Sequence, residues 1–584
     1  MKLKLILMIL AVSILGTGIT QSKPRVKIIG ADKQDPYQLN TGDAPTAFIK
    51  AQNNMNANNI DAWVQNSGTF DQDIRTNNTP GFMWPKGSNR FAIFTAGLSI
   101  GAYIEGALRL ATASYSGEYQ PGYIDNGSPV TSDIFKIYKI SDSDEPGTNP
   151  DYDNWGLMVP FGAPYVDINS NGTYDPGVDK PGIKDASQTI FVCLTDAYIE
   201  NHSQSEGFSG GTAPMNAQVQ LTLWCYNTQG LENLQFVNWT VINKGDKPWN
   251  GTHFSVVVDP DLGDADDDYI GCDTALFQRR VNDFAYCYNS DNTDGSGNPP
   301  SYGQNPPASG MDFFKSPEIF TGNPSDSVVF YDPPGSNNKR VKTGWRLLGL
   351  TSFVYFTNTS AGGVTCEQDP QQPIEAYNFM SGIKKDGSPY LFPTNLQPTK
   401  YCYAGDPETG AGWTEVTGVG NDPNQAYVNN CGGLSGTVTS SDPGDRRFIF
   451  NSGDQNFTIN PNDTQRIVLA QFVAKGSNNL NAVTKLRDLD QVAQNLFNAN
   501  FKVNPPPPKP VVNWSSRPTG SIGTVNITLS WGDTSESYNL LDTLLQPVSD
   551  SSRLVFQGYQ IYEIKKSATS FPDFTDPITL FSNN

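Results

Sequence analysis

The chain has 584 residues, with 54 Gly, 42 Pro and a formal net charge of −20 from 39 basic and 59 acidic residues. So many turn-forming residues exclude a helical bundle or a coiled coil, and the negative charge excludes binding to the nucleic-acid backbone through net positive charge. We therefore expect a mainly β protein that binds no nucleic acid.

Residues 1–22 have the pattern of a secretory signal peptide. Lys2 and Lys4 precede an apolar run from Leu5 to Leu15, and small or polar residues follow it. This run is shorter than the roughly 20 apolar residues that cross a bilayer. We expect the chain to be secreted, extracellular or on the outer cell surface, with no membrane span after the signal is removed.

Residues 23–504 are expected to form a β-rich body of one or two sandwiches. Apolar and polar residues alternate with period two over 217–225, which predicts a half-buried strand. Glycines within the apolar stretch 91–113 favour paired strands over a single helix. The stretch 345–356 predicts one strand that is buried on both faces.

One amphipathic helix is expected near the end of this body. Its apolar stripe consists of Val483, Leu486, Leu489, Val492, Ala493, Leu496 and Phe497. The charged residues expected on the opposite face are Lys485, Arg487, Asp488 and Asp490. The whole pattern predicts a multi-domain β-sandwich architecture with one C-terminal amphipathic helix packed on the main body.

A proline run at 505–510 predicts a semi-rigid linker, after which a second unit begins. In this unit Val525, Ile527, Leu529 and Trp531 alternate with polar residues, and the segment 556–562 follows. Residues 511–584 thereby resemble a fibronectin type III domain, which implies a small β-sandwich of about 100 residues. Because fewer residues are present, we expect a truncated domain in a fragment that lacks a sorting domain.

The seven cysteines are an odd number, which leaves at least one thiol without an internal partner. Cys193 and Cys225 lie in apolar, strand-like runs, where a cysteine usually packs as a small buried hydrophobic residue. The spacing of the others leaves the connectivity open. The candidate bridges are Cys402–Cys431 and Cys272–Cys287.

The segment 167–179 contains the pattern D-x-N-x-N-G, the first half of a calcium loop. Ca²⁺ takes six to eight oxygen ligands, and Gly172 permits the tight turn around the ion. An EF-hand would place Glu where this chain has Val178, so the looser calcium loop of extracellular β proteins fits better. The candidate ligands are Asp167, Asn169, Asn171, Thr173, Asp175 and Asp179. The alternative is an Asx-rich turn held by side-chain-to-backbone hydrogen bonds.

A second acidic run places seven carboxylates between residues 259 and 273, after the strand-like segment 254–258. Like charges so close together repel one another unless solvent or a cation screens them. The run therefore predicts a solvated loop or a calcium site, with catalytic carboxylates the least favoured alternative. Its candidate ligands are Asp259, Asp261, Asp264 and Asp266.

Catalysis has little support in the sequence. We expect no nucleophile motif near either histidine, and we expect His202 to be a surface or hydrogen-bonded residue. A polysaccharide-active hydrolase with accessory domains stays open, because a fold can bring together two carboxylates from distant segments. The tryptophans that could stack on a sugar, or could simply be core residues, are Trp84, Trp155, Trp224, Trp239, Trp345 and Trp413.

Five sequence blocks carry a family resemblance. They include GAPYVDINSNGTYDPGVDKPG at 162–182 and DPDLGDADDDYIGCDT at 259–274, with others at 84–106, 404–413 and 457–476. Over residues 60–500 the chain resembles an uncharacterised family of large bacterial surface proteins exported by type IX secretion. The resemblance implies export and a surface location, and the family has no assigned activity that could be carried over to this chain.

These observations lead to one expectation about function. We expect a secreted or cell-surface β-rich protein with a structural, adhesive or ligand-binding role, whose loops are stabilised by calcium. Its partner would be an extracellular ligand, either a polysaccharide or another surface protein.

Overall fold

The computed structural model describes residues 49–75, 78–203, 207–274, 284–359, 364–419, 428–429, 431, 433–434, 442–503, 508–519, 525–541, 553–556 and 558–559. The expected signal peptide, three of the linker prolines (505–507) and residues 560–584 lie outside the described residues. The corresponding predictions therefore stay predictions.

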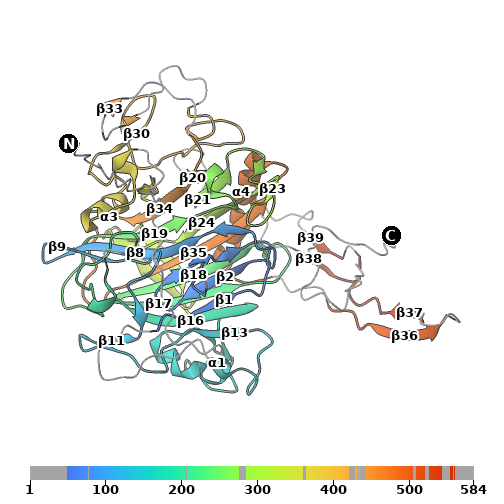
Figure 1. The fold of residues 1–584 in the computed structure, drawn as a ribbon. Coiled ribbons are helices and arrows are strands. Elements are labelled where there is room, and N and C mark those ends of the chain that lie inside the picture. The colour runs from blue at the N-terminus through green and yellow to red at the C-terminus, as the bar shows by residue number, and fades with distance from the viewer. Residues whose placement is uncertain are drawn as a thin grey trace, which may run out of the picture.

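Two large antiparallel sheets form the body (Figure 1). The first contains β1 (Gln52–Met55), β2 (Asp61–Gln65), β3 (Thr69–Phe70), β6 (Phe82–Met83), β7 (Phe91–Ile93), β8 (Thr95–Ile104), β9 (Ala107–Ala111), β19 (Asn250–Asp259), β29 (Ser352–Thr357) and β34 (Arg446–Gly453). The second contains β10 (Gln120–Pro121), β13 (Tyr138–Ser141), β16 (Gln188–Thr195), β17 (Ala217–Cys225), β18 (Leu234–Asn243), β20 (Asp268–Asp273), β21 (Phe284–Asn289), β24 (Pro307–Lys315) and β35 (Thr464–Lys475). One hydrophobic core draws residues from both sheets, so the predicted mainly β sandwich architecture is confirmed.

Segments far apart in the sequence are neighbours in both sheets. In the first sheet β19 lies between β8 and β34, and in the second β35 lies between β18 and β24. β18 pairs with β35 residue by residue, with Gln235 opposite Gln471, whereas the pairing of β24 with β35 shifts register between Phe313 and Lys315. The body therefore closes only when its C-terminal strands insert between strands formed much earlier in the chain.

Apart from the long helix α4, the remaining described elements are short. The two-stranded sheets are β4 (Gln72–Asp73) with β5 (Thr79–Pro80), β11 (Tyr123–Asp125) with β12 (Ser128–Val130), β14 (Tyr165–Val166) with β15 (Lys180–Pro181), β22 (Thr293–Asp294) with β23 (Gly303–Gln304), β25 (Glu318–Phe320) with β28 (Trp345–Leu347), β26 (Ser327–Tyr331) with β27 (Lys339–Thr343), β30 (Tyr390–Leu391) with β31 (Pro398–Thr399), β32 (Val428–Asn429) with β33 (Gly433–Leu434), β36 (Asn513–Pro518) with β37 (Val525–Ser530), and β38 (Asn539–Leu541) with β39 (Arg553–Val555). The helices are α1 (Pro150–Asp153), α3 (Pro373–Met380), α4 (Asn479–Asn498) and the 3₁₀ turns η1 (Trp155–Leu157), η2 (Val159–Phe161), η3 (Ile199–Asn201), η5 (Ala265–Asp267) and η7 (Thr365–Glu367).

The strand predictions hold in two places and fail in one. Residues 217–225 form β17 as predicted, but the strand is buried on both faces and is not half-buried. Leu221 and Leu223 face the core between the sheets, and Trp224 belongs to the second core, under α4. The stretch 91–113 forms β7, β8 and β9, with Gly106 at a φ of +80° in the turn between the last two. The stretch 345–356 is not one strand, because the chain turns at Gly349, whose φ is +69°. It divides into the short β28 and the buried β29.

Helix α4 confirms the predicted helix, but two of the four charged residues expected on its exposed face are buried. Its apolar stripe packs on the outer face of the second sheet, with Val483 and Leu486 fully buried. Lys485 and Asp488 are exposed, as expected. Arg487 and Asp490 are buried instead. Arg487 lies inside because it pairs with Asp273 at the end of β20, donating from Nε and Nη2 over 2.8 and 3.0 Å.

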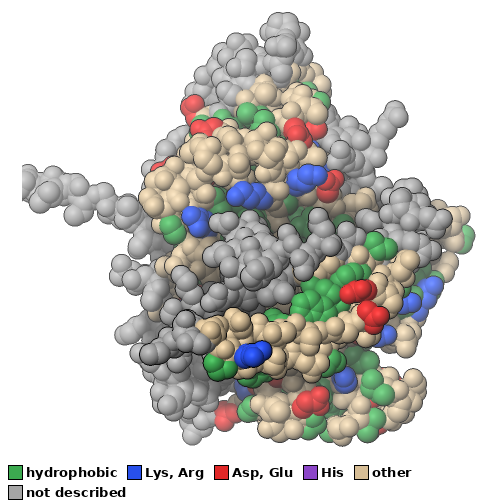
Figure 2. Space-filling model, turned by 90° about the vertical axis from the view of Figure 1, so that its right-hand side faces the viewer, with side chains coloured by type: hydrophobic (Ala, Val, Ile, Leu, Met, Phe, Trp, Pro, Cys, Tyr) green, Lys and Arg blue, Asp and Glu red, His purple; other side chains and the backbone are tan. Residues whose placement is uncertain are grey.

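The hairpins after the linker expose apolar side chains. Trp514, Ile527 and Leu529 are 72%, 64% and 40% exposed. Figure 2 views the side to which these hairpins project in Figure 1, and it shows hydrophobic side chains gathered there with acidic side chains beside them. The described part of this unit does not cover its own apolar residues.

Candidate metal centres and buried charges

The first candidate centre, residues 167–179, connects β14 to β15 as the loop of a hairpin. Ser170 and Gly172 adopt positive φ angles of 58° and 78°, which bend the chain back on itself. Asp167 occupies the inside of this bend. Its carboxylate accepts hydrogen bonds from the backbone N–H of Asn171 at 3.2 Å and of Gly172 at 2.8 Å.

The other candidate side chains of this loop converge on Asp175. Its Oδ2 accepts hydrogen bonds from the side-chain amides of Asn169 at 2.8 Å and Asn171 at 2.6 Å. Asp179 is 1% exposed and accepts from the backbone N–H groups of Ile168 and Asp175, both at 2.8 Å. All of these carboxylates and amides therefore belong to one hydrogen-bonded network.

This network has features of both alternatives for the loop, a calcium-binding loop and an Asx-rich turn. The bonds from side chains to backbone N–H groups are those of an Asx-rich turn. A half-turn of each Asn amide exchanges its N–H for its C=O, so Asn169 and Asn171 can offer oxygen to a cation at the same positions. Thr173 takes part through its backbone N–H, which donates to Asn171 Oδ1 at 2.7 Å.

The second acidic run divides into several sites. Asp259 and Asp261 lie with Asp445, and one carboxylate oxygen from each is within 4.8 Å of the others. Asp445 directly precedes β34, which pairs with β19, so the strand pairing brings it to Asp259. Sequence reasoning missed Asp445 because no local spacing connects it to the run.

A buried arginine neutralises part of this Asp259–Asp261–Asp445 group. Arg447 Nη1 donates to Asp369 at 2.8 Å, and its Nε lies 3.7 Å from Asp259 Oδ2. The Tyr115 hydroxyl donates to the same Asp259 oxygen at 2.7 Å. Arg447 therefore offsets part of the negative charge of these carboxylates.

Asp264 and Asp266 lie outside that group. Asp264 caps η5, accepting from the backbone N–H of Asp266, and its own N–H donates to Asp294 Oδ1 at 2.9 Å. Burial, with a further contribution from neighbouring carboxylates, raises the pKa of Asp267 and of Asp294 to about 6. Asp294 is a residue that the sequence analysis did not single out.

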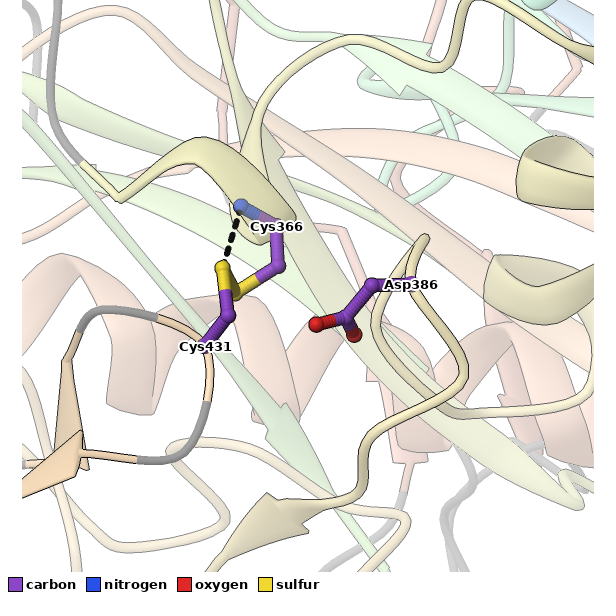
Figure 3. Close-up of side chains that lie close together, drawn as sticks. All are labelled: Cys366, Asp386 and Cys431. Carbon is purple, nitrogen blue, oxygen red and sulfur yellow. Dashed lines mark hydrogen bonds between the residues drawn. A yellow bond between two sulfur atoms is a disulfide. The ribbon is translucent and has the colours of Figure 1, made fainter.

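A third group of possible ligands is an oxidised cysteine pair. Cys366, Asp386 and Cys431 lie close together (Figure 3). Cys366 and Cys431 form a disulfide with a Cα–Cα distance of 5.5 Å, so neither sulfur is a thiolate that could bind a metal. Both bridges considered from the sequence are therefore wrong. Cys272, Cys287 and Cys402 are buried thiols, as Cys193 and Cys225 were expected to be.

The segment after His202 contains a nucleophile motif, although the sequence analysis expected no such motif near either histidine. Gly207–Gly211 fits G-x-S-x-G, and Ser209 has a φ of +56°. The His202 ring is buried and its Nε2 lies 2.7 Å from the carbonyl oxygen of Asp196, so His202 is hydrogen-bonded and not on the surface. Its Nδ1 is 3.5 Å from Glu118 Oε2.

Packing explains this motif better than catalysis does. Ser209 is 1% exposed, and among the described contacts it makes no hydrogen bond with His202. A Cβ at Gly210 would lie 2.1 Å from Glu118 Oε1, and one at Gly207 would lie 2.2 Å from the Tyr115 ring. The glycines therefore let the segment close over two buried side chains. His253 is buried too, which lowers its pKa to about 4 and keeps it neutral at pH 7.

The tryptophans are mostly core residues. Trp84, Trp155, Trp224 and Trp239 are at most 7% exposed. Trp413 is partly exposed and packs against Tyr403 with ring centroids 4.8 Å apart. Of the six candidates, only Trp345 and Trp413 are partly exposed.

A scan against protein-family models finds no match to this chain, and a search of curated protein sequences finds none. Within the described part of the chain, no helix combines the length and apolar character needed to cross a membrane.

Proposed function

We propose that this chain is an exported, calcium-stabilised β-sandwich protein with a structural, adhesive or ligand-binding role at the cell surface. The observation that carries the proposal is the convergence of Asp167, Asn169, Asn171, Asp175 and Asp179 in one loop network. Carboxylate and amide oxygens gathered on a tight loop are the ligands that Ca²⁺ prefers. The Asp259–Asp261–Asp445 group is a second calcium site in this proposal.

Three further features support an extracellular role. The signal-peptide pattern and the sequence blocks at 162–182 and 259–274 favour type IX export. The Cys366–Cys431 disulfide is typical of proteins in an oxidising compartment. The exposed apolar hairpin β36–β37 suits contact with another surface protein or a polysaccharide.

Calcium titration tests the proposal. We expect Ca²⁺ to raise the unfolding temperature and a chelator to lower it. When free Ca²⁺ is 100 times its Kd, one bound ion should add about 2.7 kcal/mol to the free energy of unfolding. Calorimetric titration should give two bound ions, and Asp175→Asn and Asp261→Asn should each remove one.

The matched control is Asp246→Asn, which changes a carboxylate that is 88% exposed and outside both groups. It should leave both ions bound. An unfolding temperature that responds neither to Ca²⁺ nor to chelator contradicts the calcium proposal.

A panel of glycans and surface proteins tests the role itself. Binding without release of product supports the adhesive or ligand-binding role. Release of reducing sugar supports the alternative of a polysaccharide-active hydrolase, which the buried tryptophans make the weaker proposal.

A further inference from the structure

A buried carboxylate crosses the space between the two sheets. Asp71 follows β3 in the first sheet with a φ of +62°, a conformation that disfavours residues with a side chain. Its backbone is held on both sides, because its N–H donates to Trp63 and its C=O accepts from Gly81, each at 2.7 Å. A Cβ at Gly81 would lie 2.6–2.7 Å from backbone atoms of Asp71 and Gln72, so this contact requires glycine.

The groups that face Asp71 belong to the second sheet and are uncharged. Gln471 of β35 donates one amide hydrogen to Asp71 Oδ1 at 3.2 Å and the other to Gln235 Oε1, also at 3.2 Å. All three side chains are 0% exposed. No described Lys, Arg or His contributes to the electrostatic environment of Asp71. An ionised carboxylate here would be an unpaired buried charge, which is strongly unfavourable.

The unsatisfied atoms indicate how the charge is removed. Asp71 Oδ2 and Gln471 Oε1 are both buried and have no hydrogen-bond partner among the described residues. Both are acceptors, so a bond between them requires a proton. A carboxylic acid and an amide form a cyclic pair when the amide N–H donates to one acid oxygen and the other acid oxygen donates to the amide C=O. The first of these two bonds is present.

We propose that Asp71 is a neutral carboxylic acid whose Oδ2–H donates to Gln471 Oε1, forming a proton-dependent clasp between the two sheets. The proton comes from solvent when the chain folds and returns to solvent when the clasp opens. A bound cation is the weaker alternative, because a hard cation such as Ca²⁺ takes six to eight oxygen ligands and the unsatisfied pair Asp71 Oδ2 and Gln471 Oε1 offers two.

The clasp makes stability depend on pH with a defined sign. Burial raises the pKa of Asp71 well above its usual value, and the bond from Gln471 lowers it only in part. The contribution to stability is thus fully present below the unfolded pKa of about 3.9 and is lost as pH rises through the folded pKa. Between the two values the unfolding constant rises about tenfold per pH unit, since one proton is released.

The variant Asp71→Asn tests the clasp, because an Asn amide reproduces the neutral acid as a donor and an acceptor. We expect it to fold and to remove this slope, so that the ratio of wild-type to variant unfolding constants rises about tenfold per pH unit above pH 4 and then becomes constant. Urea unfolding over a pH series measures the ratio.

Asp73→Asn is the matched control two residues away. Burial raises the pKa of Asp73, but hydrogen bonds from Arg75 outweigh it and leave this pKa below its usual value. Asp73→Asn should therefore be less stable than the wild type chiefly above pH 4. This pH dependence is opposite in sign to the one expected for Asp71→Asn. Infrared spectra at pH 7 give a second readout, since the wild type and Asp73→Asn should show a carboxylic-acid carbonyl band that Asp71→Asn lacks.

A wild-type-to-variant ratio that is independent of pH overturns the proposal, as does a failure of Asp71→Asn to fold. A wild type that is stabilised at fixed pH by added Na⁺ or Ca²⁺, while Asp71→Asn is not, also overturns it in favour of a buried cation.

Discussion

Residues 167–179 and 259–273 are both rich in aspartate, yet the fold satisfies them in opposite ways. In the first segment, Asp167 and Asp175 accept hydrogen bonds from groups within the same thirteen-residue loop. In the second, Asp259 meets Arg447 of β34 and Asp273 meets Arg487 of α4. The exposed loop is self-contained, whereas Asp259 and Asp273, at the ends of buried strands, pair with arginines from distant parts of the chain.

The largest expected loss of stability follows from replacing Arg487, the partner of Asp273 from a distant part of the chain. Arg487→Met should destabilise the protein by about 3–5 kcal/mol, because it leaves Asp273 as a buried charge without its bidentate partner. Urea unfolding followed by circular dichroism measures this cost. A loss below 1 kcal/mol would mean that Asp273 finds another partner and that the contrast between the two segments is overstated.

Replacing Asp179, which bonds only within its own loop in the contacts described above, should cost less stability. Asp179→Ala removes the carboxylate that joins both ends of the 167–179 loop, which leaves the N–H groups of Ile168 and Asp175 without their acceptor. We expect a loss of about 1–3 kcal/mol. Hydrogen exchange at these two amides should show whether the opening is confined to the loop. Protection that stays unchanged would argue against the network.

A smaller effect is expected at Asp294, whose buried carboxylate accepts from the backbone N–H of Asp264 in the second segment. Since burial raises the folded pKa of Asp294 to about 6, its contribution to stability is present below about pH 4 and is lost as pH rises to about 6. Asp294→Asn should remove this loss, a change in the unfolding constant on the order of tenfold or more. Carboxyl carbon NMR can follow the titration directly, and an ordinary pKa would refute it.

The smallest effect is expected on the exposed side of α4. Lys485→Met removes an ion pair with Asp488 in which both side chains are more than half exposed. Such surface pairs contribute about 0.5 kcal/mol or less. Measured beside Arg487→Met, it separates the buried pair from the exposed pair on one helix. An equal loss in the two variants would show that burial is not what distinguishes them.

Local patterns predicted what local physics controls. Period-two alternation located β17, and three- and four-residue steps located α4. The alternation predicted one buried face for β17, whereas the second core also buries the other face. The same reasoning misplaced Arg487, since charge alone suggests solvent exposure and only the position of Asp273 reveals the buried pair. Asp445 was missed for a similar reason: β34 carries it to Asp259 by strand pairing across a long stretch of chain.

The order of residues alone determined the β class, the position of the long helix and the inward bend at Gly172, because each depends on neighbours within a few positions. Which cysteines are bonded, which aspartates share a site and where Asp71 finds Gln471 depended on how the strands are arranged. Those contacts join segments whose separation along the chain is large, and only the closed sandwich brings them within reach, with β35 inserted between β18 and β24 and with β34 paired to β19.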